Sequence, residues 1–360
     1  MTVLAPSTPS AARALGIVLQ RRRTSAATAL LGAVLIASLA GAMCIGSVSI
    51  PLAEVWGILH AQLRGVESTS SAADTAIVWN IRLPRAVLGA VVGAGLAVCG
   101  MAMQAMVRNE LADPFLLGIN SGASTGAAAA ILFGVGAGLG AIALPGSAFV
   151  GALAAGVLAF VIAHTAGRLT STRLLLAGIT VGYLLTAATS FLVFAAGSAE
   201  GARSVMFWLL GSLSLAAWDG LLVAALVVVA STTVFFALAG RRFDALAIGD
   251  ETMMGLGLSP QRLRVILLVL VSLCVGVLVS VAGSIGFVGL VVPHLARRMV
   301  GAAHSRAFPV AALLGAVLLV WADVLARIVL APQELPIGIV TAVIGAPFLI
   351  ALIARTRSVA

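Results

Sequence analysis

The sequence predicts an all-α integral membrane protein with ten transmembrane helices. Of its 360 residues, 61% are hydrophobic and only 9% are charged, whereas soluble domains carry about 25% charged residues. Long stretches without any charge recur along the chain, and about 20 apolar residues are enough to cross a bilayer. All 21 basic residues are arginines. Functions that need a lysine, such as a Walker A phosphate loop, are therefore excluded.

Charge-free windows and their interruptions place the ten helices. The window 114–167 is broken by glycines and Pro145, which predicts two helices, near 117–134 and 143–166. The window 265–296 is too long for one span and is rich in glycine in its second part, which predicts a full helix followed by a short, broken one. Five other windows each predict one helix: 24–53, 86–107, 174–199, 220–240 and 335–354. Residues 307–330 are apolar apart from Asp323 and Arg327 near the end, and they predict one more helix.

The first window follows three arginines, as a secretory signal peptide does. Its apolar run is roughly twice the 7–15 residues of a signal peptide, so we predict an uncleaved first span. Residues 1–25 are expected to form a cytoplasmic tail. No linker divides the rest of the chain, which predicts a single ten-helix domain over residues 26–355.

The arginines also predict the orientation. With both termini in the cytoplasm, 16 of the 21 arginines lie inside, as the positive-inside rule requires. The outer arginines are Arg64, Arg82, Arg85, Arg203 and Arg327. Arg82, Arg85 and Arg327 lie at helix ends, and Asp323 is placed to pair with Arg327 four residues later on one helix face.

No catalytic or metal site is expected in this chain. The string Gly122–Gly126 matches GxSxG but lies inside a predicted span, not at a strand-to-helix turn. The four histidines are scattered and no carboxylate cluster lies among the spans. The three cysteines lie in apolar stretches and are expected to be small core residues. Glycines at four-residue spacing predict close helix packing, and the dispersed arginines argue against nucleic-acid binding.

Two polar stretches carry candidate functional features. Residues 240–264 predict a short amphipathic helix that ends at Gly255 or Gly257. It would expose Met253, Met254, Leu256 and Leu258, either to the membrane surface or to a soluble partner. Residues 108–123 combine polar side chains with a proline and glycines, which predicts a broken helix lining a path for a solute.

Seven sequence motifs occur between about residue 78 and residue 354, and residues 1–77 carry none. The motifs are Arg82-Leu-Pro-Arg85, Arg108-Asn-x-Leu-Ala-Asp-Pro114, Leu117-Gly-x-Asn-Ser-Gly-Ala123, Arg173-Leu-Leu-Leu-Ala-Gly178, Gly283-x-Ile-Gly-Phe-Val-Gly-Leu-Val-Val-Pro-His294, Ala322-Asp-x-x-Ala-Arg327, and Glu334-Leu-Pro-x-Gly338 with Gly345-Ala-Pro347. In this order they resemble the motifs of the permeases of bacterial importers for iron siderophores, haem and vitamin B12, the FecCD type.

The resemblance implies the fold and role of a type II ABC importer permease. Such a subunit moves a chelate across the bacterial cytoplasmic membrane by alternating access, and a ferric siderophore is favoured here over haem or cobalamin. Two partner ATPase subunits would bind ATP and Mg²⁺, so this chain would hold no cofactor and would not be an enzyme. An extracytoplasmic binding protein or lipoprotein would deliver the chelate. A second permease subunit, identical or related, would complete the path.

The resemblance also implies roles for particular residues. Arg82, Arg85 and Arg327 match arginines that dock glutamates of the binding protein, a task suited to the guanidinium fork. The loop 240–260 matches coupling helices seated in the ATPase, through Gly249, Asp250, Glu251, Met254 and Gly257. Thr170, Ser171 and Thr172 match a cytoplasmic gate, and Asn109 with Leu111 matches a constriction beside it.

One departure and two alternatives accompany this interpretation. Glu110 stands where related permeases usually have proline, which frees φ and restores an N–H donor, so we expect a less rigid gate turn. A secondary transporter would need buried ionisable residues for its coupling ions, and a membrane enzyme would need a catalytic constellation at one depth. The predicted spans lack both features.

Overall fold

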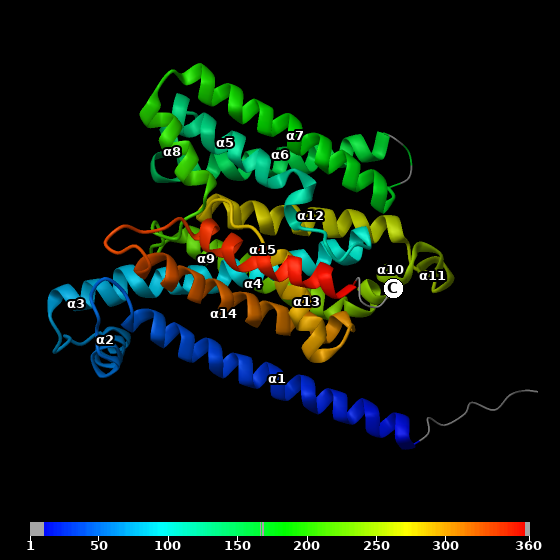
Figure 1. Cartoon of the computed structure of the whole chain (residues 1–360), viewed down its shortest axis with the longest axis horizontal. Coiled ribbons are helices and arrows are strands. Elements are labelled where there is room, and N and C mark those ends of the chain that lie inside the picture. The colour runs from blue at the N-terminus through cyan, green and yellow to red at the C-terminus, as the bar shows by residue number, and fades with distance from the viewer. Residues whose placement is uncertain (1–10, 166, 168, 357–360) are drawn as a thin grey trace, which may run out of the picture.

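Long apolar helices form this protein, because a chain in lipid has to satisfy its backbone hydrogen bonds within each spanning segment. The computed structural model describes residues 11–165, 167 and 169–356, and the regular elements in this part are all helical (Figure 1). Seven stretches are long and apolar enough to cross a membrane. They lie in α1 (Ala11–Cys44), α4 (Leu83–Val107, continued backwards to Ala72), α6 (Ala143–Thr165), α7 (Ser171–Ala196), α9 (Gly220–Leu238), α12 (Pro260–Ala282) and α14 (His304–Ile328).

Three further helices occupy the remaining predicted positions. They are α5 (Ile119–Phe133), α13 (Val288–Val300) and α15 (Ile337–Thr356). The short helix α13 follows a positive φ at Phe287 and contains Pro293, so the predicted broken helix is present. The all-α membrane fold is confirmed. By length, α5 and the apolar part of α15 are shorter than a full span, so ten complete crossings stay a prediction.

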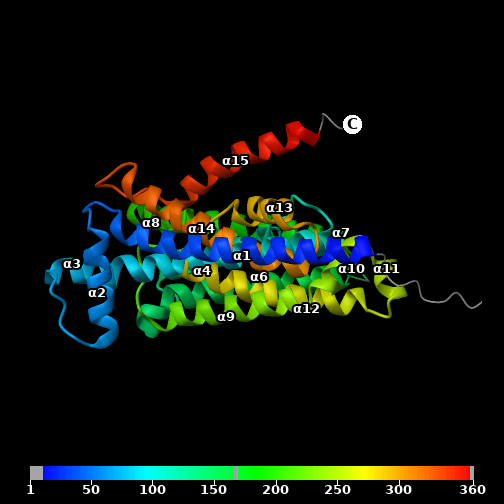
Figure 2. The ribbon, with the colours of Figure 1, turned by 90° about the horizontal axis from the view of Figure 1, so that it is seen from below.

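Short helices close the two ends of the bundle. One end carries α2 (Leu52–Arg64), α3 (Ala72–Ala76), the π-helix Ile77–Arg82 and α8 (Ala199–Leu209), and the other carries α10 (Gly240–Ile248) and α11 (Asp250–Gly255) (Figure 2). We name them the outer end and the inner end, after the predicted orientation. The helix α1 begins at Ala11 and its apolar span begins at Arg22, so residues 11–25 are helical, and their place in a cytoplasmic tail stays a prediction. Residues 1–10 lie outside the described part.

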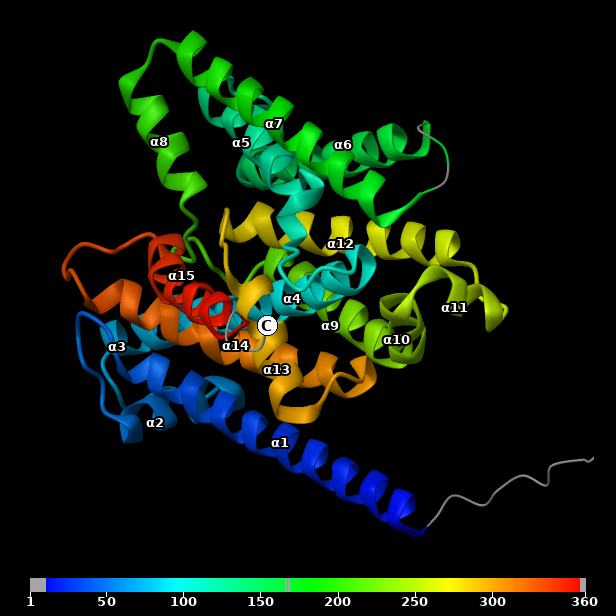
Figure 3. The same cartoon turned by 45° about the vertical axis from the view of Figure 1, so that its right-hand side comes forward.

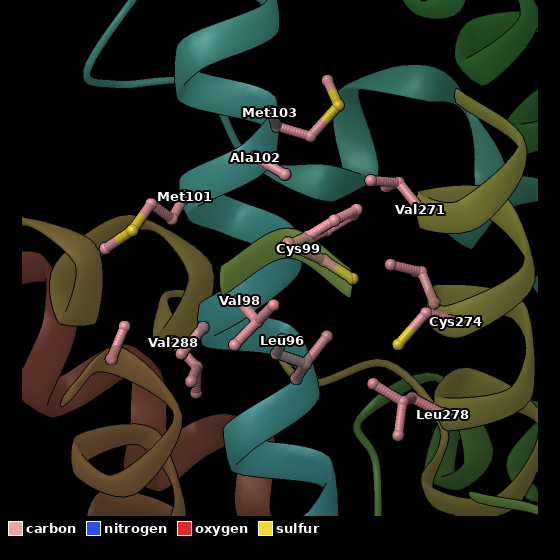
Figure 4. Close-up of a cluster of buried hydrophobic side chains, with 14 of the residues drawn as sticks. Leu96, Val98, Cys99, Met101, Ala102, Met103, Val271, Cys274, Leu278 and Val288 are labelled. Atoms are coloured by element: carbon pink, nitrogen blue, oxygen red, sulfur yellow. The ribbon is translucent and has the colours of Figure 1, made fainter. Parts of the chain in front are cut away.

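The helix α4 forms the centre of the core. Its residues from Gly95 to Val107 are all buried. Figure 4 shows Leu96 and Cys99 of α4 directed toward Cys274 and Leu278 of α12, with the two sulfur atoms facing each other. Cys99 and Cys274 are fully buried, as expected of small core residues, whereas Cys44 is partly exposed.

Glycines let the helix backbones touch. A Cβ added at Gly93 on α4 would lie 2.1 Å from the carbonyl oxygen of Gly315 on α14, and one added at Gly122 on α5 would lie 2.2 Å from that of Gly151 on α6. Packing within the bundle, the predicted role of these glycines, is therefore confirmed. The GxSxG string that starts at Gly122 belongs to this helix contact and not to a nucleophile elbow.

The Gly93 contact gives a first prediction. Replacing Gly93 with alanine should lower the free energy of unfolding by about 3 kcal/mol, because the new methyl group meets a backbone oxygen that cannot move alone. Thermal unfolding of the purified protein in detergent measures this effect. Gly32→Ala on α1 is the matched control, since nothing lies within 4 Å of its added Cβ. Equal transition temperatures for the two variants would contradict the prediction.

Candidate docking, gating and coupling sites

At the outer end, one carboxylate stands between two arginines. Arg85, near the start of α4, donates from Nε to Oδ1 of Asp323 at 2.8 Å. Arg327, one turn beyond Asp323 on α14, places its Nε 3.1 Å from Oδ2 of the same carboxylate. Asp323 is 1% exposed, and a charge buried to this degree needs such partners. The predicted pairing of Asp323 with Arg327 is confirmed.

Glu334 joins this cluster from the loop between α14 and α15. Arg85 Nη1 lies 2.9 Å from each carboxylate oxygen of Glu334. The terminal nitrogens of Arg327 donate to the carbonyl oxygens of Ala42 and Ile45, both at 3.2 Å. Arg85 and Arg327 are only 6% and 9% exposed, whereas the Glu334 side chain is 45% exposed. The solvent-facing member of the cluster is therefore an acid.

Arg82 is held by backbone oxygens of the last turn of α1 and of the connection that follows it. Its Nη1 donates to the carbonyl of Met43 at 2.7 Å, and its Nη2 donates to that of Val48. A Cβ added at Gly46 would lie 2.5 Å from Nη2. The connection thus wraps closely around the guanidinium group, which fixes the entry of the chain into α4.

All three predicted docking arginines therefore bond within the chain in this conformation, and their docking role stays a prediction. Contact with a carboxylate of another protein would have to replace some of these bonds. The sequence predicted only the local pair on α14. It missed the partners of Arg85, because Asp323 and Glu334 are 238 and 249 residues away along the chain. The available signal was Asp323 itself, a lone acid in a predicted span that needed compensating cations.

The predicted gate loop lies at the start of α7, at the inner end. Thr170 caps this helix, because its Oγ1 accepts a hydrogen bond from the backbone N–H of Arg173 at 3.3 Å. Ser171 is buried and donates to the carbonyl of Met106 at 2.9 Å, while Thr172 is exposed. Ser171 therefore ties the gate loop to the last turn of α4.

The predicted constriction begins directly after that turn. Arg108 ends α4 with a φ of 56°. The Asn109 side chain then accepts a hydrogen bond from the backbone N–H of Leu111 at 2.9 Å, a turn that asparagine favours. Leu111 is exposed, and so is Glu110, whose carboxylate lies 3.9 Å from Nδ1 of His294. The predicted loosening of this turn by Glu110 is untested, but Asn109 supplies a bond that restrains it.

The loop 240–260 forms two helices, α10 and α11, where one was predicted. They meet at Gly249, and α11 ends at Gly255 as expected. Met254 and Leu256 are 57% and 65% exposed. Met253 is 1% exposed, so the prediction that it is exposed was wrong. Adjacent residues on a helix point in directions about 100° apart, and here this turn directs Met253 into the bundle while Met254 faces outward.

A bidentate ion pair attaches α11 to α12. Asp250, the first residue of α11, accepts from Nη1 and Nη2 of Arg264 at 2.8 and 2.7 Å. This pairing holds the pKa of Asp250 below its usual range, so the carboxylate is charged at neutral pH. Glu251 is exposed, and Gly257, with a φ of 72°, turns the chain toward α12. The inner end therefore offers Glu251 and Met254 outward on a helix that is anchored through Asp250.

The described residues contain no group of three or more histidine, cysteine, aspartate or glutamate side chains placed to hold a metal ion. The arrangement instead combines a charged cluster at one end of a helical bundle with a tied loop and two short helices at the other. Such an arrangement is suited to contacts with other proteins at both ends.

Known proteins share this sequence and this fold. The FecCD transport family matches residues 12–355. The cobalamin import system permease protein BtuC of Halobacterium salinarum is 44% identical over 79% of this chain and 74% of that protein. The hemin transport system permease protein HmuU of Yersinia pestis is 40% identical over 84% of this chain and 90% of that protein. An inward-facing structure of a metal-chelate type ABC transporter matches with a TM-score of 0.78 and 28% identity, over 92% of this chain and 99% of that one. The chain is therefore a member of the FecCD transport family.

Proposed function

We propose that this chain is the transmembrane permease subunit of an ATP-driven importer for a metal chelate, working by alternating access. The observation that carries the proposal is the family match over residues 12–355, which spans nearly the whole helical bundle. The chain is a multi-pass membrane protein of a transport family and not an enzyme. We place it in the bacterial cytoplasmic membrane with both termini inside, and ATP and Mg²⁺ on the partner ATPases.

Exposed apolar surfaces suggest where partners bind. At the inner end, Ile248, Met254 and Leu256 are exposed on or beside α10 and α11, and exposed apolar groups of this kind mark interaction sites. We assign this surface, with Gly249, Asp250, Glu251 and Gly257, to the ATPase subunits. We assign the exposed faces of α7 and α15 to a second permease subunit, identical or related. A binding protein would contact the outer end.

The experiment that tests the function is uptake into proteoliposomes. The chain is reconstituted with the ATPase and binding protein from its neighbouring reading frames, and accumulation of a radioactive ferric siderophore is followed with and without ATP. ATP-dependent accumulation is expected. Accumulation that is the same with and without ATP but depends on an ion gradient would overturn the proposal in favour of a secondary transporter.

We also propose that Arg82, Arg85 and Arg327 dock the binding protein. Glu334 shares Arg85 with Asp323 and is the more exposed of the two acids. Replacing Glu334 with glutamine should therefore release part of Arg85 and remove a charge that repels incoming carboxylates. We expect the dissociation constant of the binding protein to fall about threefold at low salt, with less change at high salt. Surface plasmon resonance on nanodisc-embedded protein measures it.

Arg64→Gln provides the control for this docking prediction. Arg64 is an exposed charge at the same end but outside the cluster, so its loss should leave the affinity nearly unchanged. An unchanged or weaker affinity after Glu334→Gln would mean that Arg85 serves the fold alone.

We propose a ferric siderophore as the chelate, ahead of haem and cobalamin. The proposal rests on how widely import of iron chelates occurs in this family, because no side chain described above selects one ligand over another. Competition among a ferric hydroxamate, haem and cobalamin in the uptake assay decides between them. Preferred uptake of haem or cobalamin would contradict this choice without affecting the importer role.

A further inference from the structure

Arg264 lies in the first turns of α12 and is the largest fully buried side chain in the described part of the chain. Figure 3 shows α11 beside the start of α12 at the inner end. Besides the bidentate pair with Asp250, its Nη1 donates to the carbonyl of Leu169 at 3.2 Å and its Nη2 donates to Oγ of Ser171 at 3.1 Å. One guanidinium group therefore contacts α11, through Asp250, and the two residues that flank Thr170 in sequence, Leu169 and Ser171.

The network continues beyond Ser171. The hydroxyl that accepts from Arg264 donates in turn to the carbonyl of Met106, three residues before the constriction residue Asn109. A bonded series thus runs from Asp250 through Arg264 and Ser171 to the end of α4. Arg108 also lies near the start of α11, with its Nη1 3.7 Å from the position of an added Cβ at Gly249.

We propose that Arg264 is a positioning residue that links movement of α11 to the gate loop 170–172, through Ser171 and the preceding Leu169. The proposal rests on the proposed function, in which an ATPase displaces α11. The planar guanidinium fork holds Asp250 and the gate loop in one fixed geometry, and a buried charge cannot lose its partner without a large penalty. When α11 is displaced, the gate loop therefore moves with it or exchanges its bonds in the same step.

The alternative is that Arg264 only stabilises the fold. If Arg264 only stabilises the fold, replacing it lowers the rates of ATP hydrolysis and import together, because less intact transporter is present. If Arg264 instead links α11 to the gate loop, replacing it changes the number of ATP molecules hydrolysed per chelate imported. The ratio of the two rates therefore separates the two roles.

The test uses the complete transporter in proteoliposomes, with radioactive ferric siderophore as the probe. Ser171→Ala removes the hydroxyl while leaving the Asp250–Arg264 pair in place, and Arg264→Lys keeps the charge but loses the fork. We expect each to raise the ratio of ATP hydrolysed to chelate imported by about tenfold. The rate of hydrolysis should stay within about twofold of the original protein.

The matched controls are Ser231→Ala on α9 and Arg262→Lys, an exposed arginine two residues from Arg264. Both should keep the original ratio, and so should Ser171→Thr, which retains the hydroxyl. An unchanged ratio in Ser171→Ala, with or without a parallel fall of both rates, would overturn the proposal even if Arg264→Lys fails to fold. Failure of the proposed function is distinguishable, because the unmodified transporter would then show no ATP-dependent import.

Discussion

Replacing Asp323 with alanine is expected to lower the free energy of unfolding by about 3–5 kcal/mol or more, the range for breaking a buried ion pair by removing one partner. The reason is that Arg85 donates a hydrogen bond to this carboxylate, Arg327 lies within ion-pair distance of it, and both arginines are almost fully buried. Glu334 could compensate only Arg85. The measurement is the yield of protein in the membrane fraction, together with thermal unfolding of what is recovered.

Glu334→Ala is the control for the Asp323 prediction. It removes a carboxylate from the same cluster, but one with a 45% exposed side chain. Exposed ion pairs contribute about 0–1 kcal/mol, so this variant should fold almost normally. If Asp323→Ala were as stable as Glu334→Ala, the cluster would not hold α4 and α14 together as described.

Placing aspartate at both Met254 and Leu256 is expected to abolish import while the permease itself still folds. The two side chains are exposed at the inner end, so the change should cost the fold little. A charged group in an apolar contact with an ATPase would cost more than about 2 kcal/mol per central residue, which weakens association at least about thirtyfold. Co-purification of the ATPase with the tagged permease measures the loss.

Val66→Asp is the control for this second prediction, because Val66 is a similarly exposed apolar residue at the outer end. It should leave co-purification intact. Cysteines placed at Glu251 and Met254 provide a direct readout, since they should crosslink to cysteines introduced in the ATPase. Normal import by the double aspartate variant, or failure to crosslink in an active transporter, would remove the coupling role from α11.

The helical positions were predictable because an uncharged segment of about 20 residues can cross the bilayer, where it has to form a helix to satisfy its backbone hydrogen bonds. The break around 108–118 was predictable from its proline and glycines for the same reason. The helix α2 and the division of α10 from α11 were not predicted. Both lie outside the long apolar windows, where short helices depend on packing more than on composition.

The charged cluster was predictable only where its members are close in sequence. Four-residue spacing on one helix is enough to pair Asp323 with Arg327. The three-way bonding of Arg264 depends on loops that meet only after α4, α7 and α12 have packed. No pattern in the sequence distinguished this arginine from its exposed neighbour Arg262, because depth in the bundle is a property of the assembled helices.

The helix α15 diverges from the rest of the bundle toward its end, as Figure 2 shows. Its residues Val343 and Ile350 are exposed, as are Tyr183 and Phe194 on α7. If these exposed faces bind a second permease, the folded subunit is more stable in the dimer than alone, because binding stabilises the folded form by mass action. The lifetime of this protein in the cell would then depend on the supply of its partner, and surplus unpaired copies would be the first to be degraded.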